Sequence, residues 1–216
     1  AMNRQKTLLI FGATGMVGQQ LLTQALATDR VSRIIAPTRR PLAPHDKLEN
    51  PIIDFEALPE SAPWWKADAM LCALGTTIKQ AGSKQAFRHI DHGLVLQTAK
   101  MAKSAGTPCF VLNSSMGADP RSGNFYLKVK GELEADVTAL DFESLSLVRP
   151  SLLDAGKRPD SRPGGQLGLW FSKRLSAFIP KRYQPVSTGN VAKSMLEAAL
   201  NAKAGIHIME SDKLHY

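Results

Sequence analysis

Residues 7–18 read TLLIFGATGMVG, and this segment is the clearest indicator of the fold. An apolar run typical of a buried strand is followed by Gly12, Gly15 and Gly18 and then by an amphipathic segment. In a dinucleotide site the first glycine permits a tight turn, the second lets backbone approach a diphosphate, and the third lets helix and strand pack closely. The N-terminus of the helix would add free N–H groups for phosphate oxygens. We therefore predict a dinucleotide-binding turn, with a plain strand–helix turn as the alternative.

Six more apolar runs follow this strand, and longer amphipathic segments separate most of them. The predicted strands are residues 7–13, 32–38, 51–55, 68–75, 108–115, 144–150 and 205–211, and the predicted helices are 16–28, 83–105, 124–141 and 189–203. The strands are almost continuously apolar, as in a parallel sheet that is covered on both faces. The pattern predicts an α/β fold, a doubly wound, mostly parallel Rossmann-type sheet with helices on both faces.

The bulk composition indicates one soluble domain, and we take it to be residues 2–216. The chain has 216 residues and is 44% apolar, and it contains no apolar run of 18 residues, so we expect no membrane span. The start of the sequence lacks the layout of a signal peptide. Cys72 and Cys109 lie in apolar, strand-like runs, which favours buried reduced thiols and, with them, a cytoplasmic location.

The net charge of +8 raises the question of nucleic-acid binding. Much of the excess lies in residues 157–182, and no helix-turn-helix, zinc-ligand or RNA-recognition pattern accompanies it. We therefore expect no nucleic-acid partner, because a basic surface equally attracts a polyanionic cofactor. The region 155–185 is also rich in glycine and proline, and we predict that it is a loop-and-helix insertion near the end of the sheet.

Residues after the second, third and fourth strands predict which dinucleotide binds. The second strand ends in Arg39 and Arg40, where an NAD site would carry a carboxylate for the ribose hydroxyls. Two guanidinium groups suit a 2′-phosphate, so NADP(H) is favoured over NAD(H), although both arginines could simply be solvated. Asp54 could accept a hydrogen bond from the adenine amino group. The other predicted cofactor contacts are Thr14, Met16 and Val17 in the glycine turn, and Leu74, Gly75 and Thr76, where backbone passes the ribose.

The segment NFYLKVKGELEA, residues 124–135, places Tyr126 and Lys130 four residues apart on one face of a predicted helix. A phenol beside an ammonium can move a proton, but such a pair also arises by chance in a lysine-rich chain. Another polar group, His89, Asp91 and His92, has too few ligands for a metal site. We interpret it as polar residues at a helix start near the substrate entrance, and we expect no metal.

The chain resembles the short-chain dehydrogenase/reductase superfamily, and most closely the atypical branch typified by the human Tat-interacting tumour-suppressor protein. The resemblance lies in a series of motifs that occur in order along nearly the whole chain. They are GATGMVG (12–18), TRR (38–40), DF (54–55), CALGTT (72–77), NSSMGAD (113–119), NFYLKVKGELEA (124–135) and LVRPSLL (147–153).

The resemblance implies that a serine, a tyrosine and a lysine act together. Tyr126 would be the general acid or base for a carbonyl group, and a cation close by would favour its phenolate form. Lys130 would supply that cation and bind the nicotinamide ribose. Ser115 would orient the carbonyl, with Ser114 as the alternative hydroxyl. Arg149 and Pro150 would line the nicotinamide with their backbone.

The resemblance also implies that the basic amphipathic stretch 164–182 caps the substrate pocket, with membrane or protein contact and core packing as the alternatives. The expected function is an NADP(H)-dependent oxidoreductase that acts on a small carbonyl substrate. The alternative is a non-catalytic NADP(H)-binding regulator that acts through protein partners.

Overall fold

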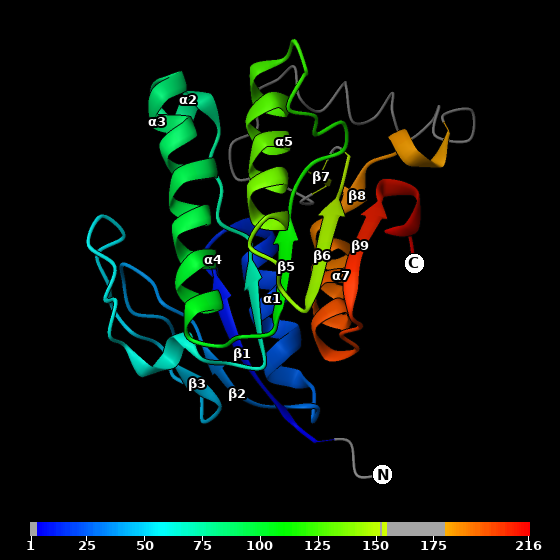
Figure 1. The fold of residues 1–216 in the computed structure, drawn as a ribbon. Helices are drawn as coiled ribbons and strands as arrows, with labels where there is room; N and C mark the ends of the chain where they lie inside the picture. The colour runs from blue at the N-terminus through cyan, green and yellow to red at the C-terminus, as the bar shows by residue number, and fades with distance from the viewer. Residues whose placement is uncertain (1–3, 152, 155–179) are drawn as a thin grey trace.

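A seven-stranded parallel sheet forms the centre of the computed structural model, which describes residues 4–151, 153–154 and 180–216. Its strands run in the order β3-β2-β1-β4-β5-β6-β9 (Figure 1). They are β1 (Lys6–Phe11), β2 (Val31–Ile35), β3 (Leu48–Glu49), β4 (Ala69–Cys72), β5 (Cys109–Asn113), β6 (Ser144–Arg149) and β9 (Gly205–Glu210). The strand order reverses between β1 and β4, and ligands of doubly wound folds bind at this switch point, beyond the carboxyl ends of the strands. The predicted fold class is confirmed.

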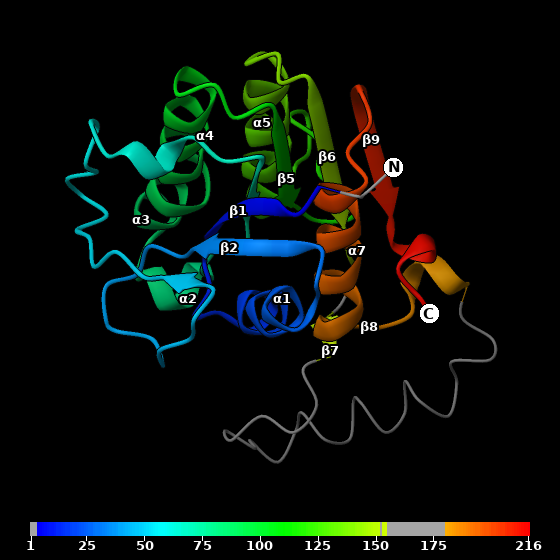
Figure 2. The same ribbon diagram turned by 90° about the horizontal axis from the view of Figure 1, so that it is seen from below.

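Helices cover both faces of the sheet. Seen from below, α1 (Met16–Ala27) and α7 (Thr188–Leu200) lie on one face and α4 (Val95–Ser104) and α5 (Phe125–Thr138) on the other (Figure 2). Side chains of one strand alternate between the two layers. In β1, Leu8 and Ile10 belong to the core beneath α1 and α7, whereas Leu9 and Phe11 belong to the core on the opposite face. These four positions are therefore all buried, which explains why this part of β1 is continuously apolar.

The predicted third strand, 51–55, is wrong. The strand that pairs with β2 is β3, two residues long, and within 51–55 only an isolated bridge between Ile52 and Thr38 continues the ladder. Pro51 has no N–H group to donate to a neighbouring strand, so regular pairing ends before it. Asp54 consequently lies in a loop beyond the edge of the sheet.

The predicted helix 83–105 is divided into three parts. It begins as α3 (Lys84–Arg88), passes through a π-helical turn, η2 (His89–Leu94), and continues as α4. A separate short helix, α2 (Ile78–Ala81), precedes it at the carboxyl edge of the sheet. A π-helical turn inserts an extra residue into a helix and is frequent at functional sites.

The region after β6 is described in part. Residues 155–179 of the predicted cap lie outside the described residues, so the cap remains a prediction. Around them, β7 (Leu153–Asp154) pairs in parallel with β8 (Val186–Ser187), and Lys181–Tyr183 form a 3₁₀ turn. Within the described ranges, none of the helices has the length and apolar character needed to cross a membrane.

Candidate functional site

The glycine turn lies between β1 and α1, at the carboxyl edge of the sheet. Gly12 has a φ of +84°, and a Cβ there would lie 2.4 Å from the carbonyl carbon of Ala73. A Cβ at Gly18 would lie 1.7 Å from the carbonyl oxygen of Gly12. These two glycines are therefore required by packing within the turn. Gly15 differs, because a Cβ there would make only an ordinary contact at 3.5 Å, and the residue is exposed at the surface of the turn.

The N-terminus of α1 has no side-chain cap. The N-cap residue of α5 is Asn124, whose side chain accepts a hydrogen bond from the Leu127 N–H. The N-cap residue of α7 is Ser187, whose hydroxyl accepts one from the Asn190 N–H. The N-cap residue of α1 is Gly15, which has no side chain to accept such a hydrogen bond. Its first-turn N–H groups therefore remain available for phosphate oxygens. The turn and helix start thus fit the diphosphate of a dinucleotide.

The side chains of Arg39 and Arg40 extend from the end of β2 into solvent. Both residues are exposed, and neither guanidinium forms an ion pair with a described residue. The turn that carries them is fixed by buried Thr38, whose hydroxyl donates to the Arg40 carbonyl at 2.7 Å. Asp54 is exposed and accepts a hydrogen bond from the Glu56 N–H. The two arginines are free to bind an anionic group.

Tyr126 and Lys130 lie in the first two turns of α5, near the same edge of the sheet. The Lys130 side chain is buried, with its Nζ 5.6 Å from the centroid of the Tyr126 ring. The same ring also packs against Phe87 of α3, with 5.5 Å between ring centroids. The residue after the lysine has to be glycine, because a Cβ at position 131 would lie 2.3 Å from the Asp119 backbone. The helix therefore packs directly on the loop that follows β5.

Asp91 binds Lys130, a contact that the sequence analysis missed. The Nζ of Lys130 donates to Oδ1 of Asp91 at 3.0 Å, and the backbone N–H of Thr76 donates to Oδ2 at 3.1 Å. Asp91 is completely buried. The interpretation of Asp91 as a helix-start residue at the entrance was therefore wrong. A signal was present, since the spacing of Phe87, Asp91 and Leu94 puts the carboxylate on the apolar helical face.

The two histidines beside Asp91 have other partners. His89 lies 3.0 Å from Glu56, and His92 lies 2.6 Å from Asp136 of α5. The three polar residues thus bind three different groups. In the part of the chain that the structure describes, no cluster of metal-ligating side chains forms.

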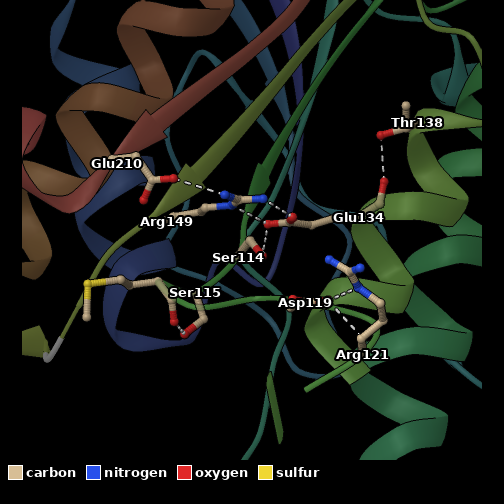
Figure 3. A network of polar contacts seen from close by, with 9 residues as sticks. Ser114, Ser115, Asp119, Arg121, Glu134, Thr138, Arg149 and Glu210 are labelled. Carbon is tan, nitrogen blue, oxygen red and sulfur yellow. Dashed lines mark hydrogen bonds and ion pairs between the residues drawn. The ribbon is translucent and has the colours of Figure 1, made fainter. Parts of the chain in front are cut away.

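The two serines after β5 have different environments (Figure 3). Ser114 is buried, and its hydroxyl donates to Oε1 of Glu134 at 2.7 Å. Ser115 is only partly buried, and its hydroxyl donates to the carbonyl oxygen of Met116 at 3.2 Å. A serine whose proton is committed to a buried carboxylate is poorly suited to orient a substrate. Of the two hydroxyls, that of Ser115 is the more accessible and makes the longer hydrogen bond.

The side chain of Arg149 is engaged within the protein, as Figure 3 shows. It donates to both carboxylate oxygens of Glu134, at 2.9 and 2.6 Å, and to Glu210 of β9 at 2.9 Å. The hydrogen bonds that Arg149 donates to Glu134, together with the charge of that carboxylate, raise the pKa of Arg149 against the opposing effect of burial. Only the backbone of Arg149 and Pro150 is left for the predicted contact with nicotinamide.

A cavity of about 270 Å³ lies at the opposite, amino-terminal edge of the sheet, beside Cys109 and Ser144. Three of its charged side chains have partners, since Arg4 pairs with Asp68 and Lys6 donates to the Ala199 carbonyl. It is remote from the glycine turn, which lies beyond the other ends of the same strands. We do not assign the site to it.

Comparison with known proteins identifies the family. The chain is 35% identical over 212 residues to Protein HTATIP2 of Rattus norvegicus, covering 94% of this chain and 84% of that protein. It is 34% identical over 226 residues to a protein of Emericella nidulans called "Protein fmp52, mitochondrial", covering 96% and 93% of the two chains. The chain belongs to the HTATIP2 and FMP52 family. The resemblance found in the sequence is confirmed, although no family model matches the chain.

The fungal relatives overturn one prediction. Family members from Emericella nidulans, Debaryomyces hansenii and Aspergillus niger are named as mitochondrial proteins, which contradicts the expected cytoplasmic location. The expectation depended on two reduced cysteines. Cys72 and Cys109 are indeed free and buried, but a thiol enclosed in a core is protected from oxidants and does not report the compartment.

Solved structures with the same fold include several that contain a nicotinamide dinucleotide. MoeE5 in complex with UDP-glucose and NAD superposes with a TM-score of 0.70 at 18% identity, covering 94% of this chain and 74% of that one. The enzyme WbmH of Bordetella bronchiseptica, in complex with NAD⁺, gives 0.68 at 15% identity, covering 96% and 76%. The oxidoreductase ylbE of Lactococcus lactis gives 0.67 at 17% identity and covers 96% and 94%. The fold is thus that of nicotinamide-dinucleotide-binding proteins.

Proposed function

We propose that this protein is an NADP(H)-dependent oxidoreductase of the short-chain dehydrogenase/reductase type that acts on a small carbonyl substrate. The observation that carries the proposal is the Tyr126–Lys130 pair. Lys130 lies buried against the Tyr126 ring at the carboxyl edge of the sheet, the same edge that carries the glycine turn with its uncapped helix start. A proton-transfer group and a diphosphate site meet at one edge.

The chain offers separate groups for each part of the dinucleotide. The backbone around Gly15 and the first turn of α1 would bind the diphosphate. Arg39 and Arg40 would bind the 2′-phosphate, since each is exposed and has no acidic partner among the described residues. Lys130 would donate to the nicotinamide ribose. When bound, NADP(H) would donate or accept the hydride.

The protein's own task is to move a proton and orient the substrate. The hydroxyl of Tyr126 would donate its proton to the carbonyl oxygen in reduction and accept it in oxidation. The partly buried hydroxyl of Ser115 would hydrogen-bond the same oxygen. Lys130 would favour the phenolate by its charge. The helix face therefore supplies both the acid and the cation that acidifies it.

Dinucleotide preference tests the cofactor assignment. We expect the purified protein to bind NADPH more tightly than NADH in a fluorescence titration. Replacing Arg39 and Arg40 with alanine should reduce NADPH affinity by about tenfold to a hundredfold and leave NADH affinity nearly unchanged. Arg33→Ala, an exposed arginine of β2 that pairs with Glu49, is the control. Equal affinities in the wild type would remove the assigned role of the two arginines.

Turnover of aldehydes, ketones and quinones tests the catalytic assignment. We expect Tyr126→Phe to lose about a hundredfold or more of the turnover number while it still binds NADPH. Tyr216→Phe, an exposed tyrosine outside the predicted cap, is the control and should retain activity. Equal slow rates for wild type and Tyr126→Phe, with NADPH binding intact, would favour the non-catalytic regulator instead.

A further inference from the structure

The π-helical turn η2 brings a carboxylate beneath the proposed catalytic pair. Asp91 lies in this turn and is fully buried, as is its partner Lys130. An isolated charge is costly in a protein interior, and a buried pair is retained only where its geometry is good. The geometry of this pair is good, because the Nζ–Oδ1 distance is 3.0 Å and the second carboxylate oxygen accepts a backbone hydrogen bond.

The second oxygen of Asp91 connects the lysine to another part of the site. Its donor, the backbone N–H of Thr76, belongs to the loop after β4 that is predicted to pass the ribose. The fit is close, since a Cβ at Gly75 would lie 3.1 Å from Oδ1 of Asp91. One carboxylate thus contacts the proposed catalytic helix and the proposed cofactor loop together.

We propose that Asp91 is a positioning residue that keeps Lys130 charged and in place and ties it to the loop at Thr76. The proposal rests on the proposed function for its catalytic meaning, but its physical content concerns Lys130 alone. Without Asp91 the ammonium would be a buried cation with no carboxylate, and burial would then favour its neutral form. A neutral amine could no longer favour the phenolate of Tyr126.

The electrostatic balance around Lys130 agrees with this role. Burial lowers the pKa of Lys130, but the charge of Asp91, the charge of Tyr126, the hydrogen bond to Asp91 and the charge of Cys72 together more than offset burial, so the pKa is raised overall. Two other titratable groups face the pair, Tyr126 from α5 and Cys72 from β4. Burial raises the pKa of Cys72 to about 12, so the thiol is neutral and cannot substitute for the carboxylate.

The test is the titration of Lys130 itself, followed by the carbon-13 shift of its Cε in the full-length protein without cofactor. The signal is assigned as the one that Lys130→Arg removes. In the wild type we expect it to titrate above the ordinary lysine value of about 10.4. In Asp91→Asn it should titrate lower than in the wild type, by about one to three pH units.

A matched control is available on helix α5. Asp136→Asn removes a carboxylate that binds the neighbouring His92 and lies on the same helix as Lys130, but it does not contact the lysine. We expect its Lys130 titration to equal that of the wild type. A folded Asp91→Asn protein with an unchanged titration would overturn the proposal. If that variant does not fold, a wild-type Lys130 that titrates at or below the ordinary value overturns it equally.

Kinetics then separate the two proposals. If the wild type is active, Asp91→Asn should lose about tenfold or more of kcat, and its pH profile should shift with the Lys130 titration. If the wild type neither binds NADPH nor turns over, the proposed function fails, and the lysine titration still decides the role of Asp91.

Discussion

Helix α5 carries two buried charged side chains one turn apart, and their partners differ. Glu134 faces Arg149, whose Nε, Nη1 and Nη2 atoms all donate to carboxylates of Glu134 or Glu210. Lys130 faces Asp91 and makes one side-chain hydrogen bond. A lysine ammonium has three donors, so two of them have no protein partner among the described residues.

The difference separates a structural pair from a pair with capacity for a ligand. The Arg149–Glu134 pair is further satisfied by the Ser114 hydroxyl, and it joins α5 to β6 and β9. Lys130 is as buried as Glu134, yet its ammonium retains donors that are not paired with a described residue, beside a phenol at the carboxyl edge of the sheet. Buried donors without partners are unfavourable. The second pair is therefore expected to complete its hydrogen bonds with a bound molecule.

The strongest test of this comparison is the removal of Arg149. Arg149→Met leaves the Glu134 carboxylate buried without its cation, and we expect the free energy of unfolding to fall by about 3–5 kcal/mol in urea denaturation. Adding Glu134→Leu should recover most of the loss, because both charges are then absent. A loss below about 1 kcal/mol would mean that the pair is not excluded from water.

Removing Lys130 should act mainly on turnover. We expect Lys130→Met to reduce kcat per folded molecule by about a hundredfold, because the phenol loses its cation and the ribose its donor. Lys128→Met changes an exposed lysine of the same helix and should leave kcat unchanged. Comparable activity in the two variants, measured under conditions where both are folded, would contradict the distinction between the pairs.

Alkaline pH should lower the free energy of unfolding through Cys72, which lies near Lys130 and Asp91. It should not act through Arg149, because arginine stays charged throughout. Burial raises the pKa of Cys72 from 9.0 to about 12. Because the pKa of Cys72 is higher in the folded than in the unfolded state, its contribution to stability is fully present below pH 9 and is lost as the pH rises from 9 to 12. The loss should be about 1.4 kcal/mol per pH unit. Cys72→Ala should give a shallower decline in unfolding free energy across this range; parallel curves would refute the assignment.

The smallest effect is expected at Glu210. Its carboxylate is 43% exposed and shares Arg149 with the buried Glu134. Glu210→Gln should therefore cost less than about 1 kcal/mol in denaturation and leave turnover and NADPH affinity unchanged. A cost similar to that of Arg149→Met would show that both carboxylates carry the network equally.

Local patterns allowed much of the fold to be predicted. Apolar strands buried on both faces, and helices with their usual periodicity, were placed within a few residues of the observed elements. The third strand failed because β3 has only two residues, too few to show any pattern. The prediction of one continuous helix over 83–105 was wrong in detail. The π-helical turn η2 packs against α3, α4 and α5, and helical spacing in the sequence does not reveal such contacts.

By itself the sequence determined the parallel α/β sheet, the glycine turn and the one-turn spacing of Tyr126 and Lys130, because each follows from residues close together in the chain. Only the tertiary structure decided which charges meet. Asp91 and Lys130 are 39 residues apart, and Arg149 and Glu134 are 15 apart on different elements. Such pairs form only when folding excludes water and brings the elements together, and the same step distinguishes Ser114, bound to Glu134, from the more accessible Ser115.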